Sequence, residues 1–328
     1  MNAPDWKQRP EGGGRFAIGL IAGIARHGGR GIARLCLYPI TVYFFCIRGS
    51  ERRASRDYLG RVLGRRVGAL DVARHIHTFA VTILDRVFLL AGRMNLFDIH
   101  AHGTEQLLTL LDQGRGVLIF GSHLGSFDAL RALARQRPGL KLRVLLDRSH
   151  NAAITDLLAE LDPALAAGII DAGQDGPSIV LAIQQALEEG AMVALLVDRE
   201  RPGDTTMAAP LLGAEVRFPT APWLLAGILK APVMLAFGLY RGRNRYDLLF
   251  EPFEETVDIP RARRAEVLSA LIHRYASRLE HHLRSAPYNW FNFYDFWHSE
   301  DLESAPSTAV RSVDRDRQHD EPGAGQRR

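Results

Sequence analysis

The chain has 328 residues, of which 47% are hydrophobic, so it can bury one large core or two modest ones. Its net charge is only +4, and almost all its basic residues are arginine, the lysines being Lys7, Lys141 and Lys230. Arginine binds phosphate and carboxylate in a bidentate way, which fits an anionic lipid surface or a phosphorylated ligand; an arginine-biased codon usage explains the bias equally well. Cys36 and Cys46 form no metal or redox motif, which argues against a disulfide-dependent extracellular scaffold and indicates a reducing compartment.

The first fifty residues alternate between apolar and basic blocks. Residues 16–24 are apolar, residues 26–34 are basic and glycine-rich, and residues 35–47 are an unbroken apolar run of thirteen. That run is shorter than the roughly twenty residues that span a bilayer, and no cleavage site of a signal peptide follows it. Its glycines and Pro39 predict breaks in the helix. We expect residues 15–50 to form helices lying on an anionic membrane surface, with two core helices or one spanning helix as open alternatives.

Helical and strand-like patterns alternate through the rest of the chain. Helices are predicted at residues 52–66, 72–90, 105–111, 129–135, 152–161, 179–189 and 262–283. Extended segments or strands are predicted at residues 98–102, 116–120, 142–146, 168–170, 192–197, 227–239 and 246–250. This alternation predicts an α/β fold with a mostly parallel central sheet covered by helices. We expect the aromatic residues 288–297 to be core or an interfacial belt, residues 1–14 to be flexible, and the polar residues 299–328 to be disordered.

The turn at residues 121–128 carries the strongest chemical signal. His123 follows an apolar strand, and Asp128 lies five residues later, where a helix begins. On one helix, residues five apart point about 140° away from each other, so contact between them needs a bend, which Gly125 permits. Ser126 can cap the helix that follows. An ionised Asp128 could orient a neutral His123, which could then take a proton from a hydroxyl group.

Two other patterns carry less information. His75 with His77, and His100 with His102, have a spacing that zinc ligands use, but neither pair has a third ligand of convincing spacing, so we expect no metal and no cofactor. The basic run at residues 52–66 is expected to be a solvated face near lipid headgroups. No nucleic-acid-binding fold or stacking motif accompanies it, so we expect no nucleic acid partner.

The turn with His123 and Asp128 resembles the histidine-x4-aspartate motif of the lysophospholipid acyltransferase-like superfamily, and the wider pattern resembles the late lipid A biosynthesis acyltransferases of the lauroyl and myristoyl type. Further matching segments follow in the family's order: Arg148 with Asn151; the strand that ends at Asp198 and is followed by Glu200; residues 210–222; and residues 287–291. The resemblance covers about residues 15–297. In one departure from the family's pattern, Arg199 and Arg201 interrupt its acidic turn.

The resemblance implies a role for each matching residue. His123 would be the base and Asp128 its orienting partner, and the acceptor hydroxyl would attack the thioester carbon directly, without a covalent acyl-enzyme. Backbone amides of residues 121–125 would help to stabilise the oxyanion. The remaining matches are expected to bind substrate: Gly125, Arg148, Asn151, Asp198 and Glu200. Arg148 also fits an ordinary surface residue.

The sequence therefore predicts a membrane-associated O-acyltransferase, with the acyltransferase domain at residues 51–298. It would use acyl carrier protein, or acyl-CoA, to acylate a hydroxyl of a glycolipid or lipid A-like acceptor. The expected location is the cytoplasmic face of the bacterial inner membrane. Two alternatives stay open: a lipid or thioester hydrolase that uses the same base to activate water, and a non-catalytic membrane-binding protein with the same fold.

Overall fold

The computed structural model describes residues 15–130, 139–149, 152–200 and 203–297. The chain divides after Trp297 into two units, and the architecture below is that of the first. The expected flexible segment at residues 1–14 and the expected disordered tail at residues 299–328 lie outside the described residues, as do Asn151 and most of the helix predicted at residues 129–135.

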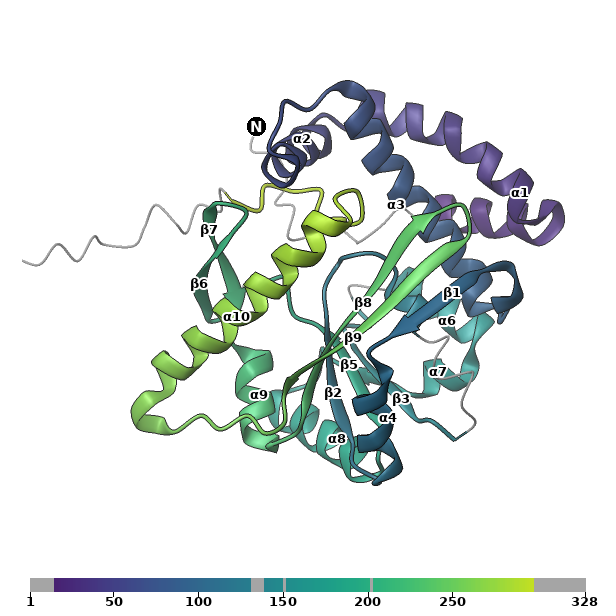
Figure 1. Cartoon of the computed structure of the whole chain (residues 1–328). Coiled ribbons are helices and arrows are strands. Elements are labelled where there is room, and N and C mark those ends of the chain that lie inside the picture. Colours follow the sequence, from purple (N-terminus) through teal and green to yellow (C-terminus); the bar gives the residue numbers. More distant parts are fainter. Residues whose placement is uncertain (1–14, 131–138, 150–151, 201–202, 298–328) are drawn as a thin grey trace, which may run out of the picture. The chain divides into compact units, whose positions relative to one another are not determined.

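A seven-stranded sheet forms the centre of this unit (Figure 1), in the order β1-β9-β8-β2-β5-β3-β4. The strands are β1 (Asp98–His102), β2 (Val117–Gly121), β3 (Leu142–Leu146), β4 (Ile169–Asp171), β5 (Met192–Leu196), β8 (Val233–Gly242) and β9 (Arg245–Glu254). Every neighbouring pair is parallel except the β8–β9 hairpin. The predicted α/β class with a mostly parallel sheet is confirmed. A separate two-stranded hairpin, β6 (Thr206–Leu211) and β7 (Ala214–Pro219), was not expected.

Helices lie on both faces of the sheet. They are α1 (Arg15–Ile47), α2 (Gly49–Leu63), α3 (Ala69–Leu90), α4 (Thr104–Asp112), α6 (Ala152–Leu161), α7 (Pro163–Ala167), α8 (Gly176–Glu188), α9 (Ala221–Leu229) and α10 (Arg264–Ser285). Of these, α1 is packed on the outside of α3. Alternate residues of a strand point to opposite faces. Leu118 and Phe120 of β2 accordingly join the core under α8, α9 and α10, whereas Val117 and Ile119 join the core under α4. All of β2 is therefore buried, which explains its unbroken apolar sequence.

The segment at residues 221–232 corrects a sequence prediction. Residues 227–239 were expected to be one strand, but α9 continues to Leu229 and β8 begins only at Val233. Pro222 lies in the first turn of the helix, where its fixed φ is favourable, and Lys230 ends the helix in the left-handed conformation. Because α9 is apolar almost all round, its periodicity does not distinguish a buried helix from a buried strand.

Helix α1 packs along α3 and exposes an apolar outer face. Its backbone breaks at Gly29 (φ 70°, ψ 174°), as the glycines predicted, but the helix continues through Pro39, so the predicted break there is wrong. Ala33 and Leu37 are buried against α3. Residues 29–47 are, among the described residues, the one helical segment long and apolar enough to cross a membrane, and 17% of them are buried. The exposed apolar residues of this face are Ile32, Leu35, Tyr38, Val42, Tyr43 and Ile47.

Candidate functional site

The candidate site lies at the carboxyl ends of the adjacent strands β2 and β5. Gly121 is in register with Leu196, so His123 and Asp198, each two residues further on, leave the sheet at the same level. Neighbouring strands lie only about 4.8 Å apart. The parallel register therefore brings together two side chains that are 75 positions apart in sequence.

Asp198 binds both the ring and the backbone of His123. The Nδ1 atom of His123 lies 2.8 Å from Oδ1 of Asp198, and the backbone N–H of His123 donates to Oδ2 at 3.0 Å. Asp198 is completely buried, and the side chain of His123 is 17% exposed. Since an ionised carboxylate only accepts hydrogen bonds, Nδ1 is the donor, and Nε2 is the ring nitrogen on the side away from Asp198.

The electrostatics of Asp198 keep this carboxyl ionised. Burial alone would raise the pKa of Asp198, but the charge of His123, its hydrogen bonds and the nearby Arg199 outweigh burial, so the pKa lies below its usual value of 3.8. A charge buried in this way needs donors on every side. The indole Nε1 of Trp290 supplies one more by donating to Oδ2 at 3.1 Å.

The segment at residues 289–292 forms backbone hydrogen bonds with the His123 turn. The amide of Phe291 donates to the carbonyl oxygen of His123 at 2.9 Å, and the amide of Gly125 donates to the carbonyl oxygen of Asn289 at 2.8 Å. Arg199 donates to the side-chain oxygen of Asn292 at 2.6 Å and to the carbonyl oxygen of Phe291 at 3.0 Å. The turn is thus held by the next strand of the sheet and by the segment at residues 289–292.

His75 of α3 supports this segment and is not placed as a metal ligand would be. It is fully buried, and its Nε2 donates to the carbonyl oxygen of Trp290 at 2.8 Å, while its Nδ1 accepts from the hydroxyl of Ser55 at the same distance. Burial lowers the pKa of His75 to about 4, so the ring is neutral at pH 7. Trp290, Phe291, Phe296 and Trp297 are buried, and the partly buried Tyr288, Phe293 and Tyr294 pack against the same core, so the aromatic cluster at residues 288–297 belongs to the core.

Gly125 has a structural reason to be glycine. Its φ is +78°, and a Cβ atom there would lie 2.0 Å from the carbonyl oxygen of Gly238 in β8. The predicted bend is therefore present. The expected contact of Gly125 with substrate is not supported, because its amide is bonded to Asn289, and the amide of His123 is likewise bonded to Asp198. Neither amide is available to an oxyanion. The Ser126 hydroxyl, expected to cap the next helix, has no partner among the described residues.

Asp128 is paired with a different residue from the one expected. Arg86 of α3 donates from Nε to Oδ2 of Asp128 at 2.5 Å. Asp128 lies in a 3₁₀ turn, Phe127–Leu130, after the bend at Gly125. The carboxylate on the ring of His123 is instead Asp198, which had been expected to bind substrate. The structure therefore revises the pairing on which the predicted role of Asp128 depended.

The other predicted substrate-binding residues are more scattered. Arg148 follows β3, which is separated from β2 by β5. Its backbone amide donates to Asp171 at 3.2 Å and its guanidinium to the carbonyl oxygen of Ile169 at 3.4 Å, both at the β4 side of the sheet. Glu200 follows Asp198 at the same edge as His123 and is half-buried. Sequence reasoning missed the roles of Arg199 and Trp290, because it gave no strand order and no path for the end of the chain.

The fold and the site define an α/β protein with a histidine–aspartate pair at the carboxyl edge of its sheet. The model of the bacterial lipid A biosynthesis acyltransferase family matches residues 77–299, which include His123, Asp198 and Trp290. The chain belongs to this family. Membership indicates an acyltransferase that uses an acyl donor and a lipid acceptor, in a membrane-associated family. A comparison with curated proteins finds no match.

The hydrogen bond from Trp290 to Asp198 predicts a difference between two tryptophan substitutions. Trp290 and Trp223 are both completely buried, but the indole nitrogen of Trp223 has no partner among the described residues. We expect Trp290→Phe to lower the free energy of unfolding at pH 7 by about 2 kcal/mol more than Trp223→Phe, because a bond to a charged group is lost. Urea unfolding of both variants measures the difference.

The pH dependence of this difference follows from the pKa of Asp198. That pKa is lower in the folded protein than its usual 3.8, so the stabilisation is fully present above 3.8 and is lost as the pH falls through the folded value. Equal losses in the two variants at pH 7 would show that the Trp290 hydrogen bond does not stabilise the buried carboxylate.

Proposed function

We propose that the chain is a membrane-associated O-acyltransferase with His123 as its general base. The observation that carries the proposal is the 2.8 Å bond between Nδ1 of His123 and the buried, ionised Asp198. This bond fixes the tautomer of the ring and stabilises the imidazolium that forms when Nε2 takes a proton. The pair resembles the histidine and carboxylate of acyl-transfer enzymes in general, where a base of this kind contributes about 10²- to 10⁴-fold in rate.

The proposed reaction is a single acyl transfer. Nε2 of His123 removes the proton of the acceptor hydroxyl as the oxygen attacks the carbonyl carbon of the acyl thioester. The tetrahedral intermediate collapses when the carbon–sulfur bond breaks, and the leaving thiolate takes the proton from His123. The products are an ester on the acceptor and a free thiol, so atoms and charges balance. Asp198 stays ionised throughout and acts through His123 as a positioning residue.

Acyl carrier protein is the proposed donor, and a glycolipid or lipid A-like molecule is the proposed acceptor. Support for the carrier protein comes from exposed arginines on and just after α2: Arg53, Arg56 and Arg66. A basic surface of this kind attracts an acidic partner and speeds its association. Acyl-CoA is the alternative donor. Support for the lipid acceptor comes from the family, whose members use one.

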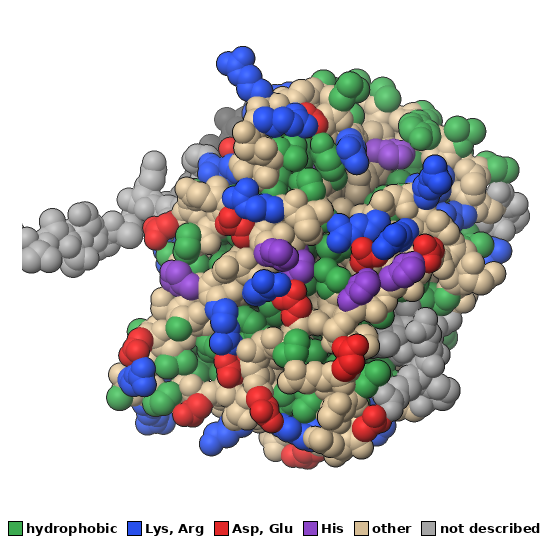
Figure 2. Space-filling view, viewed as in Figure 1, with side chains coloured by type: hydrophobic (Ala, Val, Ile, Leu, Met, Phe, Trp, Pro, Cys, Tyr) green, Lys and Arg blue, Asp and Glu red, His purple; other side chains and the backbone are tan. Residues whose placement is uncertain are grey.

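We further propose that α1 lies along the membrane surface, with the acyltransferase domain at residues 51–298 on the cytoplasmic side. One face of α1 is packed on α3, and the opposite face is apolar and exposed (Figure 2). Arg48 follows this face directly and Arg53 lies on the next helix, a pattern that suits anionic headgroups. Cys36 and Cys46 are free thiols, as expected in a reducing compartment.

The proposed reaction predicts that His123→Ala loses transfer activity. The purified protein would be incubated with labelled acyl thioester, as carrier protein or CoA ester, and with bacterial membrane lipids. We expect labelled acyl-lipid from the wild type and a loss of about 10²- to 10⁴-fold in His123→Ala. His102→Ala is the control, because His102 is also a histidine but is exposed on β1. Release of labelled fatty acid alone would favour the hydrolase, and unchanged transfer in His123→Ala would contradict the proposed base.

The proposed orientation of α1 predicts that its outer face sets membrane affinity. We expect Leu35→Ser to weaken binding to anionic vesicles about tenfold, because the leucine side chain no longer enters the lipid. Leu70→Ser is the matched control, since Leu70 is even more exposed, at 85% against 68%, but lies on α3. Equal losses from the two substitutions would contradict a membrane contact through α1. Protein that alkaline carbonate does not release from membranes would favour a spanning helix.

A further inference from the structure

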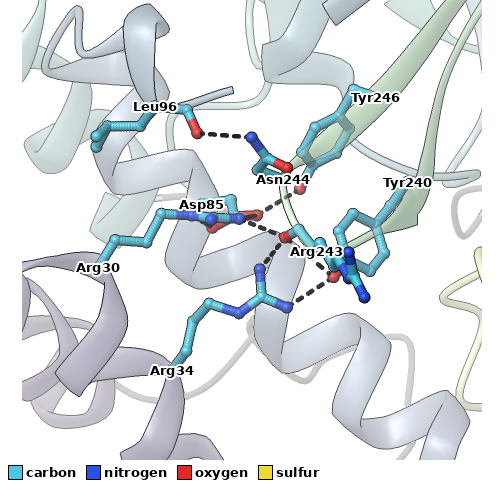
Figure 3. A network of polar contacts seen from close by, with 8 residues as sticks. All are labelled: Arg30, Arg34, Asp85, Leu96, Tyr240, Arg243, Asn244 and Tyr246. Atoms are coloured by element: carbon cyan, nitrogen blue, oxygen red, sulfur yellow. Dashed lines mark hydrogen bonds and ion pairs between the residues drawn. The ribbon is translucent and has the colours of Figure 1, made fainter. Parts of the chain in front are cut away.

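A second polar site lies between α1 and the tip of the β8–β9 hairpin. A hollow of about 380 Å³ opens there, lined by Arg30, Arg34, Leu96, Arg243 and Asn244. Figure 3 shows that the two arginines of α1 point toward the hairpin tip, where they meet the backbone of Arg243. None of these residues belongs to the site around His123.

Positive charge exceeds negative charge in this hollow. Asp85 of α3 accepts from Nε and Nη2 of Arg30 at 2.8 and 2.9 Å, and from the hydroxyl of Tyr246 at 2.9 Å. Asp85 pairs with Arg30, whereas Arg34 and Arg243, which also line the hollow, have no carboxylate partner among the described residues. The three guanidinium groups and the one carboxylate together carry two net positive charges. These would neutralise the two negative charges of a doubly ionised phosphate monoester.

The hairpin tip holds Arg243 in a strained backbone conformation. Its φ is +52°, in the left-handed region where glycine, asparagine and aspartate are favoured in two-residue hairpin turns. Its carbonyl oxygen accepts from Arg30 Nη2 at 2.7 Å and from Arg34, whose Nη2 also donates to the hydroxyl of Tyr240 at 2.7 Å. The backbone of the tip is thus fixed by α1. The guanidinium of Arg243 itself is exposed and has no hydrogen-bond partner within the described part of the chain.

The hollow lies between α1, the helix proposed to contact the membrane, and β8, the strand that contacts the turn of His123. Arg30 and Arg34 lie on α1, whose outer face is proposed to enter the lipid, but on its side toward α3 and the hairpin tip, where they bind Asp85 and the backbone of Arg243. On the other side, the tip continues β8, in which Gly238 touches the turn of His123. Five residues of strand separate Gly238 from Arg243, which is roughly 17 Å.

We propose that Arg34 and Arg243, with Arg30, bind the phosphate monoester of a membrane lipid. Guanidinium groups match phosphate oxygens in geometry as well as in charge. The left-handed backbone at Arg243 is strained, and α1 holds it in place through the Arg243 carbonyl oxygen. Backbone strain of this kind is commonly retained at functional sites. The assignment rests on the proposed membrane function, because it is the lipid surface that brings such a headgroup to α1.

The test measures binding of a soluble short-chain phosphatidic acid, below its critical micelle concentration, to the full-length protein by calorimetry. We expect the wild type to bind it more tightly than the short-chain phosphatidylcholine. In Arg243→Asn the affinity for phosphatidic acid should fall about tenfold, as one charge-assisted contact is lost. The thermal midpoint should not fall, because asparagine tolerates the left-handed conformation better and the carbonyl held by Arg30 and Arg34 remains.

Arg245→Asn is the matched control, since it removes the same charge from the same hairpin but lies in the strand β9, where it pairs with Asp247. Its affinity for phosphatidic acid should stay close to that of the wild type. Equal affinity of the wild type for the two lipids, or equal losses in the two variants, would overturn the site. Binding is measured without membrane or acyl donor. The result therefore tests the phosphate site even if the protein proves to have no transferase activity or α1 proves not to contact the membrane.

Discussion

One buried negative charge organises the site of this protein. Asp198 has no exposure to solvent, and a carboxylate in such a place is stable only when donors surround it. The donors come from two distant parts of the chain: the ring and amide of His123 after β2, and the indole of Trp290 after α10. Because both segments must be in place to satisfy one carboxylate, completing the fold also completes the orientation of His123. The structural requirement and the proposed catalytic requirement therefore coincide.

The same arrangement explains why several unremarkable residues cannot easily change. Gly125 brings the His123 turn against β8, where a side chain would collide with the backbone of Gly238. His75 carries no charge at neutral pH and serves to hold the carbonyl of Trp290 from α3. Arg199, which interrupts the acidic turn expected for the family, binds the 289–292 segment instead. These residues act through position, and each joins a different element to the site.

Much of the fold follows from sequence patterns, whereas the pairing at the site does not. The bounds of β3 and α6 match their predicted ranges, because each is a short apolar run between clear breaks. The boundary between α9 and β8 is predicted wrongly, because the apolar residues on either side of Lys230 fit a buried helix as well as a buried strand. His123 was found from its position after a buried strand. Nearness in sequence and the resemblance to the histidine-x4-aspartate motif both predict Asp128 as its carboxylate partner, but the strand order, which local patterns do not contain, places Asp198 beside it.

The most direct test of this account compares two carboxylate substitutions in the acyl-transfer assay. Asp198→Asn keeps the shape of the side chain but removes the charge that stabilises a protonated His123, and we expect a rate loss of about 10³- to 10⁴-fold in protein that remains folded. Asp128→Asn removes a charge of equal size that is paired with Arg86, and its rate should fall far less, with the main effect on stability. A larger rate loss in Asp128→Asn than in Asp198→Asn would contradict the assignment of Asp198 as the partner of the base.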